Sequence, residues 1–432
     1  MSLSDIKEAL IKAIEENREE IIQIGEYILK NPEMGYCEEK TSEFVRKKFD
    51  ELGIEYEHPY AITGVKAKLK GRSSKYNVCI IGEMDALKCK GHPFADSNDT
   101  AHACGHNTQL AGMLGVAIAL SKSQIMKELD GDVTLMAVPA EEFIDLAYRK
   151  SLKEEGKIKY FGGKQQMVCE GAFDDVDIVM MIHSKGDEPT GKLYSGGGSL
   201  GFVAKTITFR GKAVHGSTPF DGVNALNAAA LAILGIHSNR ETFREEEQIR
   251  IHPIITKGGS VVNSVPDEVC METYIRGATL EAVEKGNRVV ERAAIGAAQI
   301  MGATVDFETI SGYLPLNNSS ELSSIFEECS KEIIGEENVI KDLSVSGSSD
   351  IGDISCLLPT IQPYMGGFCG GIHMQSFTVN DNEAAYILPA KLMVTAAAEL
   401  LYNNAQKASN VKKAFVPSLT KKEYIKYLEG EK

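Results

Sequence analysis

A cysteine and a histidine lie close together in the segment Ala101-His-Ala-Cys-Gly-His-Asn107. Cys104 and His106 are two residues apart, and the glycine between them lets the backbone turn tightly. A thiolate and an imidazole at this spacing can both reach one metal ion. An isolated pair of this kind is more often a buried thiol beside a hydrogen-bonded histidine, so the other segments must decide between the two interpretations.

Two adjacent carboxylates follow an apolar run, in the segment Pro139-Ala-Glu-Glu142. The run 132–138 is predicted to be a buried strand, and active sites of α/β proteins form at the carboxyl ends of such strands. Neighbouring side chains there point in different directions, so one carboxylate could bind metal while the other accepts a proton from water. The alternative is an exposed acidic helix start, which the helix dipole favours.

Two further histidines occupy positions that suit metal ligands. His183 ends the apolar run 178–182, and His373 ends the segment Met365-Gly-Gly-Phe-Cys-Gly-Gly-Ile-His373. A polar ring at the end of a buried strand needs a partner, and metal is one candidate among several. Each histidine alone would more often be structural. Together the four segments supply enough ligands for a two-metal centre, with Glu141 left over. The predicted ligands are Cys104, His106, Glu142, His183 and His373.

These side chains require a scaffold, and most of the chain predicts alternating helices and strands. Such alternation is typical of an α/β layer with mostly parallel or mixed pairing. The predicted strands are 64–70, 77–82, 132–138 and 176–183, and the predicted helices are 4–31, 41–52, 108–122 and 389–404.

The pattern changes after the glycines at 196–198. The following elements have the order β-α-β-β-α-β, which is typical of a ferredoxin-like unit. They are predicted at 199–210, 222–238, 248–257, 266–276, 279–301 and 303–310. We therefore expect a catalytic domain formed by 1–195 and 311–405, an inserted lid at 196–310, and a polar tail at 406–432.

Composition excludes several other classes of protein. With 432 residues, the chain is long enough for two or three domains. A net charge of −15 and a pI near 5.2 make nucleic acid an unsuitable partner. We expect no membrane span, because no run of 18 apolar residues occurs, and the N-terminus does not resemble a signal peptide. Nine scattered cysteines favour a reducing, cytoplasmic location.

At this point the sequence resembles a known family, the M20 metallopeptidases, and within it the aminoacylase and amidohydrolase branch. The resemblance covers nearly the whole chain and rests on several motifs in the right order. These motifs are Asn31-Pro-Glu-Met-Gly35, Glu83-Met-Asp-Ala-Leu87, His102-Ala-Cys-Gly-His106, Pro139-Ala-Glu-Glu142, Gly211-Lys-Ala-Val-His-Gly-Ser217, Val262-Asn-Ser-Val-Pro-Asp267 and Ser349-Asp-Ile-Gly-Asp353.

The resemblance implies a role for each candidate residue. The five ligands predicted above would hold two divalent metals, with the Cys104 thiolate bridging them, and Glu141 would be the general base. Asp85 is also expected in the catalytic set. The inserted lid would mediate a homodimer. Its residues His215, Asn263 and Arg276 would hold the tetrahedral intermediate or the substrate carboxylate, although each could equally be an ordinary surface or turn residue.

The sequence departs from the branch at positions beside the metal motifs. Asn107 and Gln109 stand where many members have Asp and His, which is more similar to the side of the branch that cleaves p-aminobenzoyl-glutamate and dipeptides. Glu83 replaces the usual Asp. After Glu142 the common glycines give way to Phe143-Ile-Asp-Leu-Ala-Tyr-Arg-Lys150 and a longer stretch through Lys164. These changes affect the expected acyl-side specificity, not the expected chemistry.

The sequence thus predicts a two-domain metal-dependent amidohydrolase. A hydroxide bridging two Mn²⁺ or Zn²⁺ ions, with Co²⁺ or Ni²⁺ as further candidates, would attack the amide of an N-acyl amino acid, an aminobenzoyl-amino acid or a dipeptide. Two alternatives remain at this stage. Cys104 could be the nucleophile of a thiol hydrolase, which leaves Glu142, His183 and His373 unexplained. The chain could also be a silent metal or ligand binder, which leaves Glu141 unexplained.

Overall fold

The computed structural model describes residues 1–341 and 347–430 and divides the chain into two compact units. The first unit is built from Met1–Gly198 and from most of the chain between Asn317 and Glu423. The second is built from Ser199–Leu316 with two short later segments. Each unit has its own buried apolar core. The inserted unit therefore begins and ends within a few residues of the predicted 196–310.

The first unit is organised around a sheet of six strands in the order β1-β2-β6-β3-β7-β15. Strands β6, β3, β7 and β15 run parallel to one another, whereas β2 runs antiparallel to both of its neighbours, β1 and β6. Every residue of β3 and β6 is buried, which explains their continuously apolar sequences. The expected mixed α/β architecture is confirmed. The strands are β1 Tyr56–Tyr60, β2 Gly64–Leu69, β3 Asn77–Glu83, β6 Asp132–Val138, β7 Ile178–Met180 and β15 Thr360–Ile361.

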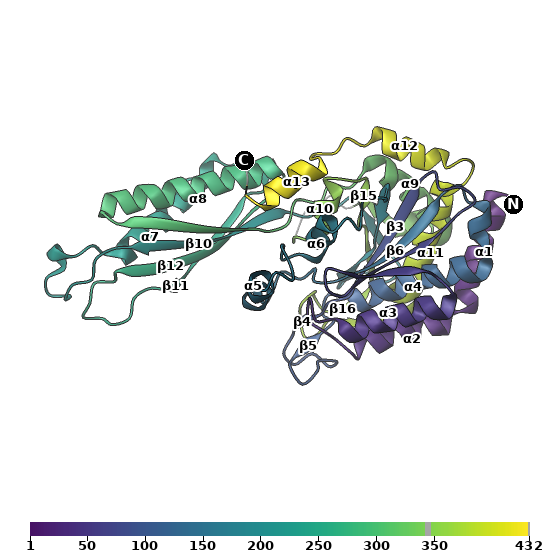
Figure 1. Cartoon of the computed structure of the whole chain (residues 1–432), viewed down its shortest axis with the longest axis horizontal. Helices are drawn as coiled ribbons and strands as arrows, with labels where there is room; N and C mark the ends of the chain where they lie inside the picture. The colour runs from purple at the N-terminus through teal and green to yellow at the C-terminus, as the bar shows by residue number, and fades with distance from the viewer. Residues whose placement is uncertain (342–346, 431–432) are drawn as a thin grey trace. The chain divides into compact units, whose positions relative to one another are not determined.

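Helices pack beside this sheet, as Figure 1 shows for α4 next to β3 and β6. Helix α4 is buried from its first residue through Leu120, as expected of a helix that is apolar on all sides. The single helix predicted at 4–31 is wrong, because the chain breaks at Asn17. The Asn17 amide donates to the Ala13 carbonyl at 2.7 Å and so competes with the helical backbone bonds. The main helices are α1 Leu3–Glu16, α2 Arg18–Leu29, α3 Glu39–Leu52, α4 His106–Ser123, α9 Ser320–Ile334 and α11 Leu388–Leu401.

A second sheet in the same unit carries His183. The strand predicted at 176–183 is in fact two strands, since β7 ends at Met180 and β8 begins at His183. There the chain leaves the large sheet and pairs in parallel with β16, with His183 opposite Tyr364. An apolar run does not show where a chain passes from one sheet to another. The sheet contains β8 His183–Gly186, β9 Leu193–Ser195, β14 Val339–Lys341, β16 Tyr364–Cys369 and β17 Thr378–Val379.

The second unit confirms the expected ferredoxin-like arrangement. Its four strands form an antiparallel sheet in the order β11-β12-β10-β13, and two helices cover one face of it. Strand β11 is an edge strand, and most of its side chains are exposed. The elements are β10 Gly201–Arg210, α7 Ala225–Ser238, β11 Arg250–Lys257, β12 Glu268–Gly277, α8 Leu280–Met301 and β13 Thr304–Ser311.

Several short elements complete the chain. The departure at 143–165 contains a helix and leads into a second one, and the predicted polar tail forms two helices, in which Tyr424 is fully buried. These elements are β4 Leu87–Lys88, β5 Thr100–Ala101, α5 Leu146–Glu154, α6 Gly163–Cys169, α10 Ile351–Ser355, the π-helical turn Glu383–Ile387, α12 Gln406–Ala414 and α13 Lys421–Leu428.

One helical stretch among the described residues, Glu383–Leu401, is long and apolar enough to cross a membrane. However, 89% of it is buried inside the protein, which is the behaviour of a core helix.

Candidate metal centre

The start of helix α4 brings Cys104 and His106 against strand β8. Gly105 has a φ of 82°, a conformation that glycine adopts readily, and His106 is the first residue of the helix. A Cβ on Gly105 would lie 2.8 Å from the Cβ of Ser184, so only glycine allows this close approach. The Ser184 hydroxyl donates to the Cys104 carbonyl at 2.7 Å. The tight turn predicted between the two ligands therefore also docks them on β8.

The His106 ring is held in the form that a metal ligand requires. Its Nδ1 lies 2.8 Å from the Asp85 carbonyl oxygen, and a carbonyl only accepts, so Nδ1 carries the proton. The Nε2 atom therefore presents a lone pair. Nε2 is fully buried, and no described residue forms a hydrogen bond to it. Hydrogen bonds from the remote nitrogen to a carbonyl are typical of metal-binding histidines.

His183 is oriented in the same manner. Its Nδ1 lies 2.9 Å from the Ser184 carbonyl oxygen, which again leaves a lone pair on Nε2. That Nε2 lies 3.5 Å from the Cys104 Sγ. The rings of His106 and His183 are 6.0 Å apart and nearly perpendicular. Two imidazole lone pairs and one sulfur therefore converge on the same small volume.

The two adjacent glutamates at the end of β6 reach this volume from another side. The Glu141 Oε2 lies 3.9 Å from the His106 Nε2. The Glu142 Oε1 lies 3.0 Å from the Nε2 of His373. The backbone N–H of His373 donates to the Ala103 carbonyl at 2.7 Å, which ties the glycine-rich segment to the cysteine motif. The structure thus brings all four predicted segments together.

Beside a set formed by Glu83, His106 and Glu141, the converging atoms form two sets of three that share the sulfur of Cys104. One set joins Cys104 with His106 and His183, the other joins it with Glu142 and His373, and within each set the ligand atoms lie within 4.8 Å of one another. Thiolate, imidazole and carboxylate are ligands of Zn²⁺ and of related transition metals. Buried Glu142 Oε1, like His106 Nε2, makes no hydrogen bond with the described residues. The residues present fit a pair of metal ions.

The electrostatics of the cluster favour a bound cation. Burial and the Glu142 carboxylate raise the pKa of the Cys104 thiol well above its ordinary value. Burial alone would lower the pKa of His106, but Cys104, Glu83 and Asp85 outweigh it and raise the pKa. The raised pKa of His106 indicates an excess of negative groups around it, which a metal ion can neutralise in place of protons.

Asp85 supports the ligands from beside the cluster. Its Oδ2 accepts the backbone N–H of Glu142 at 2.9 Å, and its Oδ1 lies 3.2 Å from the Nδ1 of His106. Burial opposes ionisation of Asp85, but the hydrogen bond and charge of His106, the backbone N–H of Glu142 and the charge of Arg149 together outweigh it and lower the pKa to about 2. Asp85 is therefore an anion that orients the imidazole of His106 and the backbone of Glu142.

The structure adds a buried cation that we did not predict from the sequence. Lys164 and Glu83 are both fully buried, and the Lys164 Nζ lies 2.5 Å from the Glu83 Oε1. The other Glu83 oxygen accepts from the Gln109 amide at 2.8 Å and lies 3.1 Å from the His106 Nε2. Glu83 and Gln109 were noted only as departures from the family pattern. Both positions differ from the family pattern, and two such differences together could have indicated that Glu83 and Gln109 contact each other.

The three predicted lid residues all lie in the second unit. His215 and Asn263 are exposed and belong to neighbouring loops, because Gly216 donates its N–H to the Asn263 carbonyl at 2.7 Å. Arg276 lies in β12, is half-buried, and donates to the Ser348 hydroxyl at 2.6 Å. Its guanidinium also lies 5.4 Å from the centre of the Phe202 ring. Burial lowers the pKa of Arg276.

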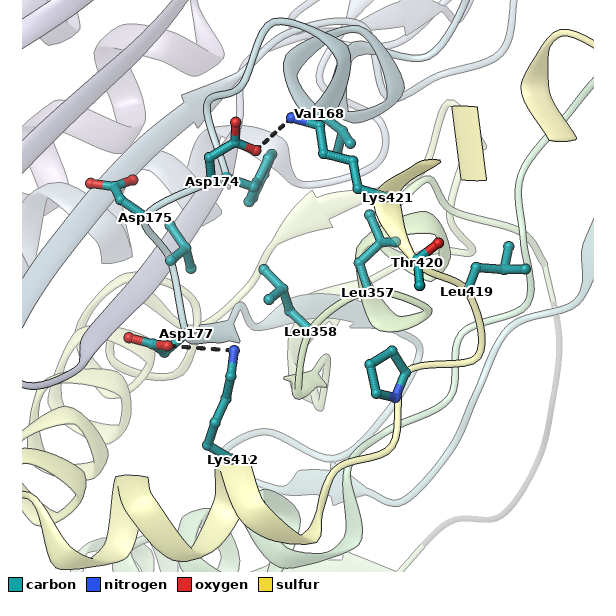
Figure 2. A pocket seen from close by; sticks show the side chains of 13 residues that line it. Val168, Asp174, Asp175, Asp177, Leu357, Leu358, Lys412, Leu419, Thr420 and Lys421 are labelled. Atoms are coloured by element: carbon teal, nitrogen blue, oxygen red, sulfur yellow. Dashed lines mark hydrogen bonds and ion pairs between the residues drawn. The ribbon is translucent and has the colours of Figure 1, made fainter. Parts of the chain in front are cut away.

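A cavity of about 430 Å³ lies elsewhere on the first unit (Figure 2). Asp177, which lines it, precedes β7, whereas the metal cluster contains His183, which follows that strand. The acidic groups on its wall already have partners. Lys421 lies 2.5 Å from Asp174, and Lys412 lies 3.4 Å from Asp177. The cavity contains none of the predicted site residues, so it is not the candidate active site.

Comparison with known proteins agrees with this geometry. An IAA-amino acid hydrolase ILR1-like 2 from Arabidopsis thaliana is 27% identical over 410 residues, covering 90% of this chain and 87% of the plant protein. A thermostable carboxypeptidase 2 from Saccharolobus solfataricus is 28% identical over 378 residues, covering 84% and 89% respectively.

Solved structures share the fold at lower identity. The Bacillus subtilis YXEP protein, described as a dinuclear metal binding peptidase from the M20 family, has a TM-score of 0.72 at 24% identity, covering 90% of this chain and 99% of its own. An aminobenzoyl-glutamate utilization protein from Klebsiella pneumoniae has a TM-score of 0.68 at 19% identity, covering 91% and 99%.

The family model for peptidase family M20/M25/M40 matches residues 79–399, a range that contains every candidate metal ligand. The chain belongs to the peptidase family M20/M25/M40 and is a hydrolase of amide or peptide bonds.

Proposed function

We propose that this enzyme hydrolyses the amide bond of an N-acyl amino acid, an aminobenzoyl-amino acid or a dipeptide. The observation that carries this proposal is the pair of ligand sets sharing Cys104, with the carboxylate of Glu141 directly beside them. The related proteins include an IAA-amino acid hydrolase and a carboxypeptidase, both of which release an amino acid from an amide. Mn²⁺ or Zn²⁺ suits the donor set.

Within this site, Glu141 has the position of a general base. Cys104, His106, His183, Glu142 and His373 would hold two metal ions, whose chemistry would be to lower the pKa of a water molecule and to polarise the scissile carbonyl. Glu141 accepts the proton of that water and then donates it to the nitrogen of the leaving amine. Glu142 cannot share this task, because its oxygen faces His373 as a metal ligand. Asp85 keeps His106 and the backbone of Glu142 in place during both transfers.

Nucleophilic attack by Cys104 is the second candidate. The contact between Cys104 and His183 supports it, since a Cys–His pair can activate a thiol. However, burial and Glu142 raise the pKa of the Cys104 thiol, the opposite of what a reactive thiolate needs. That mechanism also gives Glu142 and His373 no role. We therefore favour the metal-dependent mechanism.

The lid residues are assigned to the substrate carboxylate. Arg276 can bind a carboxylate through two parallel hydrogen bonds, and His215 and Asn263 supply further polar groups. A free carboxylate on the substrate distinguishes N-acyl amino acids and dipeptides from other amides. The assignment rests on the family resemblance of the motifs that contain these residues.

We also propose a cytoplasmic homodimer. All nine cysteines, which lie in the described part of the chain, are free thiols, as expected in a reducing compartment. The edge strand β11 exposes Ile254 and Ile255, and an exposed apolar edge is a natural pairing surface. Light scattering at micromolar concentration tests the dimer, and a monomer would contradict it. An Ile254→Lys variant should dissociate, whereas the control Ile300→Lys, on helix α8, should not.

The function is tested by measuring free amino acid released from a set of N-acyl amino acids and dipeptides. Reactions are run with Mn²⁺, with a chelator, and with Glu141→Gln and Glu142→Gln variants. We expect turnover to be lost in all three controls. Metal content separates the variants, since Glu141→Gln should keep both metals and Glu142→Gln should lose one. Turnover that survives both the chelator and Glu141→Gln would instead support Cys104 as nucleophile.

A further inference from the structure

Ala140, the residue directly before the two active-site glutamates, has an unusual backbone conformation. Its φ is 55°, in the left-handed region that residues other than glycine rarely adopt, and its side chain is fully buried. It connects the end of strand β6 to Glu141 and Glu142. Such a conformation persists only when the surrounding structure enforces it, and it then fixes the direction of the residues that follow.

Both polar groups of the Ala140 backbone are held by buried side chains. Its N–H donates to the Glu38 Oε1 at 2.8 Å. Its carbonyl accepts from the Arg149 Nη1 at 3.3 Å and from the backbone N–H of Gly163 at 3.1 Å. Glu38 and Arg149 are themselves buried. Glu38 is fixed in turn by the Thr63 hydroxyl at 2.8 Å. Glu38 therefore binds the N–H of Ala140 and Arg149 binds its carbonyl, and burial restricts the movement of both side chains.

Arg149 also reaches beyond the base. It donates to the backbone carbonyl of Glu142 and, at 2.5 Å, to that of Phe161. The carbonyls of residues 140 and 142 lie on either side of Glu141 in the chain, and one guanidinium holds both. This arrangement fixes the peptide plane that precedes Glu141 and the one that follows Glu142. A planar fork of donors is suited to this task, whereas a lysine ammonium is not.

The surrounding sequence is adapted to this guanidinium. A Cβ on Gly35 would lie 2.7 Å from the Arg149 Nη2 and 2.9 Å from the Ala140 Cα, so glycine leaves room for both. The Tyr36 ring lies beneath the guanidinium at 5.5 Å, and the Tyr36 hydroxyl donates to the Tyr160 carbonyl at 3.0 Å. Arg149 comes from α5, in the stretch where this chain departs from the glycines common in its family.

We propose that Arg149 and Glu38 are positioning residues that hold Ala140 in its left-handed conformation and thereby aim the base Glu141 and the metal ligand Glu142. The helix α5 thus supplies a support for the segment that carries both glutamates. This inference rests on the proposed function for the role of Glu141. Its effect on Glu142 can be measured without any substrate.

The first test is a titration of metal-free protein with Co²⁺, followed by the visible absorption of the cobalt ions. In Arg149→Lys, the site formed with Glu142 and His373 should bind about 10- to 100-fold more weakly, as is usual when a supporting partner of a ligand is changed. The site formed with His106 and His183 should keep wild-type affinity. The control Lys150→Met removes the neighbouring charge from the same helix and should leave both affinities unchanged.

The second test combines Arg149→Lys with Ala140→Gly. Glycine adopts a positive φ without support, so the loss caused by Arg149→Lys should be smaller in the glycine background. An equal loss in both backgrounds would show that Arg149 does not act through Ala140 and would overturn the proposal. Wild-type cobalt binding by Arg149→Lys would also overturn it. A glycine at position 140 can still adopt the native backbone conformation. The double variant therefore shows whether Arg149 acts through Ala140 even if Arg149→Lys lowers the stability of the protein.

The third test separates positioning from general stability. With a cleavable substrate, Arg149→Lys should lower kcat about 100-fold with little change in KM, since misplacement of a base slows the chemical step. A change in KM alone would contradict the proposal. Failure of the wild-type enzyme to cleave any amide would refute the proposed function, but the cobalt titration would still decide whether Arg149 positions Glu142.

Discussion

Lys164 and Glu83 form an ion pair that is completely shielded from solvent, with the Lys164 Nζ 2.5 Å from the Glu83 Oε1. The pair lies directly behind the metal ligands, because the second Glu83 oxygen is 3.1 Å from the His106 Nε2. Burial would raise the pKa of Glu83, but Lys164 together with His106 and His183 outweighs it, and the pKa is lowered. Glu83 is therefore an anion whose charge is shared between a lysine and the metal site.

Removal of Lys164 should leave Glu83 as a buried charge with too few partners. Breaking a buried pair by removing one member typically destabilises a protein by about 3–5 kcal/mol. We expect Lys164→Met to show a loss of this size in urea unfolding of the metal-free protein. The control Lys157→Met removes a lysine that lies near Glu155 on the exposed part of the same stretch, and it should change stability little. Equal losses in the two variants would contradict this account.

Gly105 offers a test of the close approach between helix α4 and strand β8. Alanine there would have both an unfavourable φ of 82° and a Cβ 2.8 Å from Ser184. Gly53 is a matched control, because its φ is 67° but a Cβ there would meet no described atom within 4 Å. Gly53→Ala should lose about 1 kcal/mol from backbone strain alone. Gly105→Ala should lose clearly more and should also weaken metal binding, as measured by thermal unfolding and metal content.

Metal removal should lower the thermal stability of the first unit. A ligand that binds only the folded state at 1,000 times its Kd stabilises it by about 4 kcal/mol. Chelator should therefore reduce the unfolding temperature of the wild type, and added Mn²⁺ or Zn²⁺ should restore it. His106→Ala should respond less to chelator than the wild type, because one ligand set is broken and the set of Cys104, Glu142 and His373 remains. The lid variant His215→Ala should respond as the wild type does, and an insensitive His215→Ala would contradict the ligand assignment.

The candidate ligands could be proposed from the sequence because their chemistry is local. Cys104, His106 and the adjacent glutamates stand in short motifs whose residue types already define what they can bind. The β-α-β-β-α-β unit was equally predictable, since its elements alternate with regular lengths. The structure brings together the four predicted ligand segments, which lie far apart in the sequence, in two sets sharing Cys104.

Other features were not predictable because they depend on contacts across long stretches of chain. Nothing near Arg149 in the sequence indicates that it holds the carbonyls of Ala140 and Glu142. The division of the predicted 176–183 strand depends on pairing with β16, which lies far along the chain. Asn17 ends a helix whose apolar spacing continues on both sides, because its side chain competes for a single carbonyl.

The last prediction concerns stability against pH. Glu399 forms ion pairs with Lys7 and Lys407, and each lysine Nζ lies 2.5 Å from a Glu399 carboxylate oxygen. Burial would raise the pKa of Glu399, but the hydrogen bonds from Lys407 and Lys7 outweigh it and lower the pKa below its ordinary 4.5. A carboxylate with a lowered folded-state pKa contributes stability that is complete above pH 4.5 and is lost as the pH falls through the folded value.

Glu399→Gln should therefore destabilise the metal-free protein by about 2 kcal/mol at pH 7, the usual value for hydrogen bonds to charged groups. The difference from wild type should shrink below pH 4.5, where the wild-type carboxylate itself becomes protonated. Urea unfolding at pH 7 and at lower pH measures both values. The control Glu332→Gln removes the more exposed partner of Lys7 and should have a small effect at either pH. A Glu399→Gln difference that grows on acidification would show that Glu399 does not stabilise the fold as an anion.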